Sequence, residues 1–221
     1  DIEFASTPYN VRDVKFLNEL GVSFFKSSSM HLVEINFLRE IGLTGKPLII
    51  STGMASIDEI DRAVNVINET GNSNFTLLQC TTNYPTNIAE VNLLSMVTMG
   101  NRYHCNYGYS DHTQSDIACL GAVALGASVI EKHFTLDKTM KGPDHFSSAD
   151  PSEFATLIDG IRAMEIALGS AEKKPTKSEL ENMIDMRRSL STLENIREGE
   201  LITEQNMICR RPAKGISPDY W

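Results

Sequence analysis

The chain has 221 residues, of which 41% are hydrophobic and 22% charged, a composition that supports a buried core and excludes an intrinsically disordered chain. Its formal net charge of −9 argues against general binding to nucleic acids or anionic membranes, which requires a basic surface. No apolar run approaches the roughly 20 residues that a membrane-spanning helix needs.

Short apolar segments alternate with segments of helical periodicity along the first 170 residues. We predict strands at residues 3–7, 23–27, 47–51, 75–80, 104–110 and 128–134. Apolar spacing predicts helices at 11–20 and 57–67, and the small, apolar residues of 117–127 predict a tightly packed helix there. A capping box of Ser56 and Glu59 precedes the second helix, and Asp150 followed by Pro151 is a typical start for a further helix.

Strands that alternate with helices predict βαβ units and a parallel sheet. Two architectures fit this pattern, an open doubly wound sheet and a closed (β/α)8 barrel of the TIM type. Polar side chains occur at the carboxyl ends of all six predicted strands. An open sheet concentrates its ligand groups near one switch point, whereas a barrel collects them from most strand ends. The sequence therefore favours the barrel, with about six of its eight units present.

After residue 170 the sequence becomes rich in lysine, proline and serine. We predict a barrel domain at 1–170, a linker with a short helix at 179–188 within residues 171–188, and a small β-rich module at 189–221. The four cysteines are far apart and form no Cys-x-x-Cys pair. We expect them to be buried, reduced thiols, which places the protein in the cytoplasm.

Several strand ends carry groups suited to binding a small anion. Lys26 follows two phenylalanines, and the small polar side chains expected around it at the strand ends are Ser27, Ser28, Ser29, Ser51, Asn83 and Ser110. One fixed ammonium among small hydrogen-bond donors suits a phosphate or a carboxylate. The alternative is that serine and threonine are ordinary residues of βα turns.

Two histidines suit a divalent metal ion. His112 and His133 are 21 residues apart, one βαβ step, so they project from neighbouring strand ends and fit Mn²⁺, Fe²⁺ or Zn²⁺. Asp111 is a candidate for orienting one of them. Strand alternation turns Glu131 inward with His133 and Lys132 outward. The alternatives are two ordinary hydrogen-bonded histidines, and a Glu131 that only partners Lys26.

At these same positions the sequence resembles the N-acetylneuraminate (sialic acid) synthase family, and its Ser-Asp-His-Thr motif is similar to the bacterial form. The matching strings are STP (6–8), FK (25–26), STGM (51–54), NYP (83–85), GYSDHT (108–113), EKHFTLD (131–137) and GPDH (142–145), with RP (211–212) and GISP (215–218) in the tail. The resemblance implies a (β/α)8 barrel followed by an antifreeze-like (SAF) domain. It also implies a fragment without the first two barrel strands and the end of the second domain.

The resemblance further implies a condensation of phosphoenolpyruvate with an open-chain N-acetylated aldose such as N-acetylmannosamine, with release of phosphate. The residues implied to bind phosphoenolpyruvate are Thr7, Lys26, Ser29, Ser51, Asn83 and Ser110. Tyr84, Glu131 and Asp144 match positions that contact the sugar or move protons, with Glu131 and Lys26 as catalytic residues. His112 and His133 match the ligands of a divalent ion, Mn²⁺ or alternatively Mg²⁺ or Co²⁺. Arg211 matches a residue that reaches the sugar in a partner subunit, which implies a domain-swapped homodimer.

Three alternatives remain open at the level of sequence. One is legionaminic or pseudaminic acid synthesis, with a deoxy diacetamido sugar as the acceptor. Another is a non-catalytic short form that binds a sugar or a full-length partner, and a third is a barrel that condenses phosphoenolpyruvate with an aldose phosphate. Departures from the family pattern bear on the substrate: Met30 is expected to crowd its loop, His31 to change a sugar contact, and residues 114–116 to alter the following turn.

Overall fold

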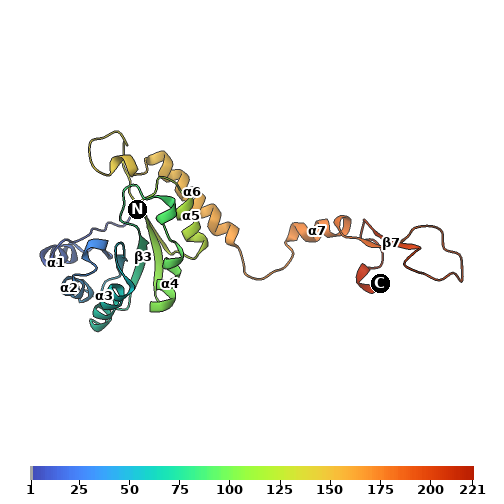
Figure 1. Ribbon diagram of the computed structural model, residues 1–221, viewed down its shortest axis with the longest axis horizontal. Coiled ribbons are helices and arrows are strands. Elements are labelled where there is room, and N and C mark those ends of the chain that lie inside the picture. Colours follow the sequence, from blue (N-terminus) through green and yellow to red (C-terminus); the bar gives the residue numbers. More distant parts are fainter. Residues whose placement is uncertain (1) are drawn as a thin grey trace. The chain divides into compact units, whose positions relative to one another are not determined.

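The structure is a computed structural model that describes residues 2–221. The chain forms two compact units (Figure 1), the first ending at Gly169 and the second running from Ser170 to Trp221. Within residues 2–221, no helix has both the length and the apolar content needed to cross a bilayer.

The first unit is built on one parallel sheet whose strands are neighbours in the order in which they occur in the chain. The strands are β1 (Phe25–Ser27), β2 (Leu48–Ser51), β3 (Phe75–Cys80), β4 (Asn106–Asp111) and β5 (Val129–Lys132). The helices of this unit are α1 (Val11–Leu20), α2 (Ile35–Gly42), α3 (Ile57–Glu69), α4 (Leu94–Tyr103), α5 (Ile117–Ala124) and α6 (Pro151–Leu168). Helices α2 to α5 each connect two successive strands, so all five carboxyl ends meet at one edge.

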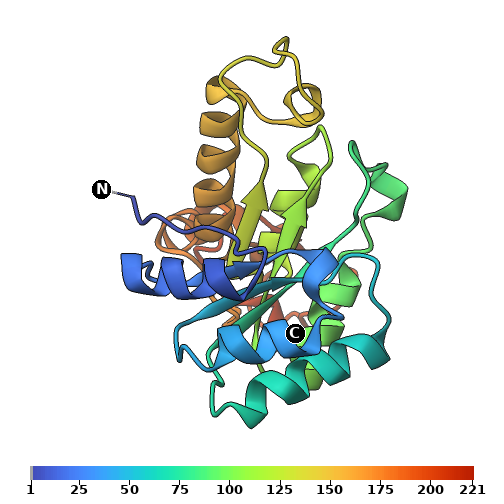
Figure 2. The same ribbon diagram turned by 90° about the vertical axis from the view of Figure 1, so that its left-hand side faces the viewer.

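This sheet is curled, with the helices on its outer side (Figure 2). It is a partial (β/α)8 barrel, which confirms the predicted fold class. Two sets of buried side chains fill the space between strands and helices. The larger set packs Phe25, Leu48 and Leu77 against Leu38 of α2 and Ile67 of α3, and all five are nearly inaccessible. Burial of this apolar surface is the main force that holds the helices on the sheet.

The predicted strand at 3–7 is wrong, whereas the other five predicted strands are present. Residues 3–7 form no regular structure, and Phe4 is 64% exposed. A parallel strand is defined by its ladder of hydrogen bonds to a neighbour. Within residues 2–221, β1 forms such a ladder only with β2, and so the apolar alternation of 3–7 does not produce a strand.

Glycine at position 108 allows β4 and β5 to lie close together. A Cβ atom at this position would overlap the carbonyl oxygen of Val129, the residue that faces Gly108 across the β4–β5 pair. The same two strands end at Asp111 and Lys132, which also face each other in the register. Their carboxyl ends therefore lie side by side.

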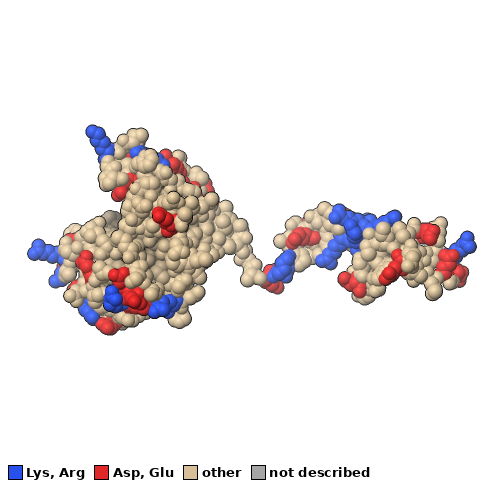
Figure 3. Space-filling model, viewed as in Figure 1, with Lys and Arg blue, Asp and Glu red and all other residues tan. Residues whose placement is uncertain are grey.

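The second unit contains α7 (Lys177–Met186) and an antiparallel pair of strands, β6 (Ser189–Thr192) and β7 (Met207–Arg210). Helix α7 starts two residues earlier than predicted because Thr176 and Glu179 form a capping box. The hydroxyl of Ser189 donates to the carbonyl of Pro212 over 2.8 Å. Basic side chains gather on the face of this unit seen in Figure 3.

Candidate functional site

A cavity of about 520 Å³ opens at the carboxyl ends of the strands in the first unit. Its wall contains every predicted site residue except Asn83 and Arg211. The lining residues are Thr7, Tyr9, Lys26, Ser28, Ser29, Met30, Ser51, Met54, Cys80, Thr82, Tyr84, Ser110, His112, Glu131, His133 and Asp144. The parallel sheet brings together those that lie at strand ends, because every strand contributes its carboxyl end to the same edge. Thr7 and Tyr9 come from the segment before α1, and Asp144 comes from the loop after β5.

One side of the cavity is organised around Lys26, whose side chain is 13% exposed. Its ammonium donates to Ser51 Oγ at 2.8 Å and to the carbonyl of Ser27 at 2.9 Å. The carboxylate of Glu131 lies 3.5 Å away and accepts a hydrogen bond of 2.6 Å from Ser110 Oγ. Burial lowers the pKa of Lys26, and the negative charge of Glu131 opposes this shift. The result is a cation held among hydroxyls, which suits an anionic ligand.

The ends of β1, β2 and β3 are packed tightly beside Lys26. The backbone N–H of Gly53 donates to Ser29 Oγ at 2.9 Å, and a Cβ at Gly53 would overlap Thr82 Oγ1. Ser29 also reaches the thiol of Cys80 at 3.6 Å. Burial favours a raised pKa for Cys80, but its contacts with His112 and Ser29 outweigh burial and lower it. A glycine at position 53 is therefore needed for the close approach of these three strand ends.

The opposite side of the cavity is formed by His112, His133 and Tyr84. The two imidazole centroids are 5.2 Å apart, and the Tyr84 ring lies 4.1 Å from His112 and 5.5 Å from His133. His112 Nδ1 is 2.8 Å from the carbonyl oxygen of Thr81. Because a carbonyl oxygen only accepts, Nδ1 carries the hydrogen, and Nε2 keeps its lone pair for another partner.

The two imidazoles differ in their electrostatic surroundings. Burial favours a lower pKa for His112, but its contacts with Cys80 and the Thr81 carbonyl outweigh burial and raise it. Burial and the neighbouring His112 lower the pKa of His133, whose Nδ1 lies 3.9 Å from the carboxylate of Asp144. His133 is therefore the more readily neutral of the pair, the form in which an imidazole binds a metal.

The histidine pair fits a divalent metal ion with two protein ligands. His112 offers a free Nε2, its ring is fixed by a backbone carbonyl, and His133 faces the same space. A hydrogen bond from the other ring nitrogen is the usual support of a metal-binding histidine. In the part of the chain that the structure describes, no three His, Cys, Asp or Glu side chains are arranged to hold an ion. Oxygen atoms of substrate or water would complete the coordination.

Asp111 does not orient an imidazole by direct contact, the way in which a carboxylate usually supports a metal-binding histidine. Its carboxylate contacts neither His112 nor His133 and instead accepts from Lys132, Tyr109, Thr113 and Cys119. Ser110 and Asp111 are successive residues of β4, so their side chains leave opposite faces of the sheet. The carbonyl of Thr81 supports His112 in place of Asp111. The outward orientation predicted for Lys132 is confirmed.

Comparisons with known proteins place the sequence in a family. The profile described as "NeuB family" matches residues 1–173. The chain belongs to the NeuB family. This family member is 45% identical over 219 residues to the N,N'-diacetyllegionaminic acid synthase of Campylobacter jejuni, covering 98% of this chain and 66% of the relative. It is 40% identical over 221 residues to the synthase of the same name from Legionella pneumophila, covering 98% of this chain and 62% of the relative.

The structural comparison agrees with the sequence comparison. The crystal structure of N-acetylneuraminic acid (sialic acid) synthetase from Leptospira borgpetersenii, in complex with citrate, matches this NeuB family member with a TM-score of 0.77 and 37% sequence identity. The match covers 82% of this chain and 64% of that one. The chain thus spans less than two thirds of the length of these relatives.

Two predicted site residues of this NeuB family member lie outside the cavity. Asn83 is exposed, and its carbonyl accepts a 2.7 Å hydrogen bond from Thr86 Oγ1. The preceding residue, Thr82, lines the cavity in its place. The chain has left β3 at Cys80, and beyond a strand end the two-residue alternation no longer predicts which side chain faces inward. Arg211 is exposed and belongs to the second unit.

The residues that depart from the family pattern lie in different places. Met30 lines the cavity and is 53% exposed, and its crowding of the loop stays a prediction. The change of a sugar contact expected at His31 stays a prediction; His31 does not line the cavity and is buried between Tyr9 and Phe37, with its Nδ1 3.0 Å from Glu34. Residues 114–116 line a different pocket, next to Lys132 and Lys138.

Sequence reasoning missed the roles of Tyr9, Met54, Cys80 and Thr82 as cavity residues. Met54 has a positive φ of 66°, which is uncommon for a residue with a Cβ and occurs preferentially at functional sites. Cys80 is the last residue of β3, a position that points to the site in a parallel barrel. All four cysteines are free, with Cys80 and Cys119 buried and the other two half-buried.

Proposed function

We propose that this chain is part of a nonulosonate synthase, which condenses phosphoenolpyruvate with an open-chain N-acetylated aldose and releases phosphate. The observation that carries the proposal is the pairing, in one cavity, of a half-buried ammonium among hydroxyls with two facing imidazoles. The first arrangement suits the phosphate and carboxylate of phosphoenolpyruvate. The second suits an aldehyde oxygen held by a metal ion. The names of the relatives support the same reaction class.

In this reaction the methylene carbon of phosphoenolpyruvate bonds to the aldehyde carbon, water adds at the neighbouring carbon, and phosphate leaves. We assign binding of the anion to Lys26 together with Ser29, Ser51 and Ser110, which lie around one side of the cavity. Holding both reactants in one geometry removes much of the entropic barrier. Donors fixed in advance also stabilise the charge that develops on the departing phosphate.

Thr7 and Asn83 are assigned to the same substrate on the strength of the family resemblance. Thr7 lines the cavity. Asn83 would have to turn inward when the ligand binds, and Thr82 is the better placed of the two residues.

We propose that His112 and His133 hold a divalent ion, Mn²⁺ in the first instance, with Mg²⁺ or Co²⁺ as alternatives. A bound ion supplies a Lewis acid that polarises the aldehyde oxygen. Tyr84 and Asp144 border the imidazoles and are assigned to the sugar. Glu131 is assigned proton transfer at the reacting carbons, with its position held by Ser110 and Lys26.

A deoxy diacetamido sugar is the favoured acceptor over N-acetylmannosamine. Identities of 45% and 40% connect this chain to two proteins named N,N'-diacetyllegionaminic acid synthase. The identity to the sialic acid synthetase is 37%. A panel of acceptor sugars, with identification of each product by mass, distinguishes legionaminic, pseudaminic and sialic acid synthesis.

For the second unit we propose an antifreeze-like domain whose Arg211 reaches the sugar in a partner subunit of a domain-swapped homodimer. This assignment extends the family resemblance, and the exposure of Arg211 supports it. The proposed location is the cytoplasm, consistent with four free cysteines. Sedimentation equilibrium of the wild-type chain measures the oligomeric state directly.

The test of the function uses this chain with phosphoenolpyruvate, Mn²⁺ and each acceptor sugar, and follows phosphate release and product mass. We expect a nonulosonate product and loss of metal activation in the variant His112→Ala. His104→Asn is the matched control, since His104 is exposed at the end of α4, before β4 begins. Sugar binding without phosphate release, even after mixing with a complete relative, would instead support a non-catalytic short form.

A further inference from the structure

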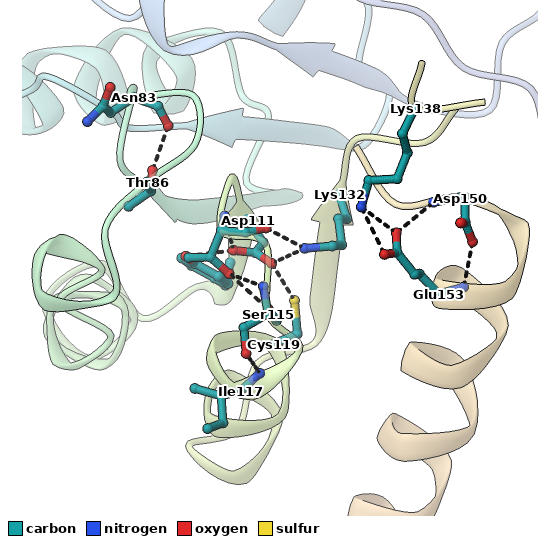
Figure 4. Close-up of polar contacts among 12 residues, drawn as sticks. Asn83, Thr86, Asp111, Ser115, Ile117, Cys119, Lys132, Lys138, Asp150 and Glu153 are labelled. Atoms are coloured by element: carbon teal, nitrogen blue, oxygen red, sulfur yellow. Dashed lines mark hydrogen bonds and ion pairs between the residues drawn. The ribbon is translucent and has the colours of Figure 1, made fainter. Parts of the chain in front are cut away.

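A buried ion pair lies on the outer face of the sheet, behind the two histidines. Asp111 Oδ2 and Lys132 Nζ are 2.5 Å apart, and their side chains are 0% and 5% exposed. Figure 4 shows the pair between the ends of β4 and β5, beside the start of α5. Neither residue lines the cavity.

The carboxylate of Asp111 has a complete set of donors. Oδ1 accepts from the Tyr109 hydroxyl at 3.1 Å and from the Thr113 N–H at 2.8 Å. Oδ2 accepts from Lys132 and from the Cys119 thiol, the latter at 3.2 Å. The ammonium of Lys132 makes a second bond, 2.9 Å long, to the carbonyl of Thr113. The group therefore joins β4, β5, α5 and the turn after β4.

This network holds the backbone on both sides of His112. The residue before it, Asp111, and the residue after it, Thr113, are tied to each other and to Lys132. Lys132 in turn directly precedes His133. Asp111 and Lys132 also face each other in the β4–β5 register. One ion pair thus links the two backbone positions from which the imidazoles leave the sheet.

Stability alone does not account for such a pair. Removing two charges from water carries a large desolvation cost, and apolar residues of similar volume are often as stable or more stable. The best-attested benefit of a buried polar pair is that it selects one arrangement of the surrounding backbone. Here that arrangement is the one that brings the two imidazole centroids to 5.2 Å.

We propose that Asp111 and Lys132 are positioning residues that set the spacing and orientation of His112 and His133 for a divalent ion. This inference rests on the metal site of the proposed function. Supporting contacts behind metal ligands typically change metal affinity by about 10- to 100-fold when they are removed. We expect an effect in this range although neither side chain touches the ion.

The test is the double variant Asp111→Asn with Lys132→Met, which removes both charges and leaves no buried ion unpaired. Mn²⁺ is added to the chain, and its dissociation constant is measured from the EPR signal of the free ion. We expect a thermal midpoint close to that of wild type and Mn²⁺ binding about 10- to 100-fold weaker. Lys138→Met is the matched control, because it removes the charge of another paired lysine. Lys138 lies in the loop after β5, and its Nζ is 2.8 and 2.9 Å from the two carboxylate oxygens of Glu153. The Mn²⁺ affinity of this control should equal that of wild type.

A second measurement separates the inference from the metal assignment itself. Nuclear Overhauser contacts between the His112 and His133 rings, recorded without metal, should be present in wild type and weakened in the double variant. If wild type does not bind Mn²⁺, the metal assignment is refuted, and the ring contacts alone decide the positioning role. Unchanged Mn²⁺ affinity together with unchanged ring contacts in the double variant would overturn the inference. If the double variant does not fold, Tyr109→Phe takes its place, since it removes one donor to Asp111 and leaves the ion pair intact.

Discussion

Replacing Lys26 by methionine tests the anion-binding side of the cavity. The variant keeps the length of the side chain and removes an ammonium held by Ser51, Ser27 and Glu131. A hydrogen bond to a charged group contributes about 1.5–3 kcal/mol. At about 1.4 kcal/mol per tenfold change in affinity, we expect phosphoenolpyruvate to bind about 10- to 150-fold more weakly.

The same substitution should have little effect on the free energy of unfolding. The Glu131 side chain is 39% exposed and keeps its hydrogen bond from Ser110, so it is not left as a buried unpaired charge. Pairs with this degree of solvent contact contribute about 0–1 kcal/mol. Loss of affinity at nearly constant stability is therefore the expected signature of a ligand contact.

Isothermal titration of phosphoenolpyruvate into the purified chain measures the dissociation constant, and urea unfolding measures stability. Lys46→Met is the matched control, because Lys46 is also half-buried and donates to a carbonyl, that of Val22, at 2.7 Å. Lys46 precedes β2 and so lies at the other end of the sheet. Equal affinity of Lys26→Met and wild type, or an equal loss in both variants, would refute the reasoning.

Two further predictions concern stability. Gly108→Ala should destabilise the chain by about 1–3 kcal/mol in urea unfolding, because its Cβ would overlap the Val129 carbonyl and force β4 and β5 apart; an unchanged midpoint would contradict the packing described here. Hydrogen bonds from Lys138 and from the backbone of Asp150 lower the pKa of Glu153. The contribution of the Glu153 carboxylate to stability is therefore fully present above the ordinary glutamate pKa of about 4.3. It is lost as the pH falls through the lowered pKa. The variant Glu153→Gln keeps an acceptor for the helix cap and should make the thermal midpoint less dependent on pH below about 4.3. If the midpoint of the variant falls with pH as steeply as that of wild type, the role given to the Glu153 carboxylate is contradicted.

Much of the fold could be predicted because the strands of a parallel sheet are continuous apolar runs with polar ends. The third strand of the structure, Phe75–Cys80, has the predicted bounds. The segment 3–7 has a similar composition but no ladder, since pairing depends on a neighbour in space that local sequence does not encode. Long-range pairing is thus the part of the fold that the pattern could not supply.

The position of the cavity was predictable for a related reason. In a parallel βα arrangement every strand ends at the same edge, so the polar residues after each strand are brought together whatever their separation in the chain. This accounts for the common location of Lys26, Ser51, Ser110 and His133. Side chains in the irregular turns follow no fixed period. The sequence therefore predicted Asn83 as a cavity residue, whereas the structure has Thr82 there.

The two-residue period of a strand also explains why a neighbour in sequence is a poor guide to a neighbour in space. In β4 and β5, Ser110 and Glu131 turn inward, while Asp111 and Lys132 turn outward at the next register position. The oxygen atoms of Asp111 therefore lie on the other face of the sheet from the His112 imidazole and do not contact it. Asp111 acts on the imidazole through the backbone they share, and its partner comes from the adjacent strand. Support of this kind would appear in a sequence as paired positions on neighbouring strands, each one residue before a histidine of the proposed metal site.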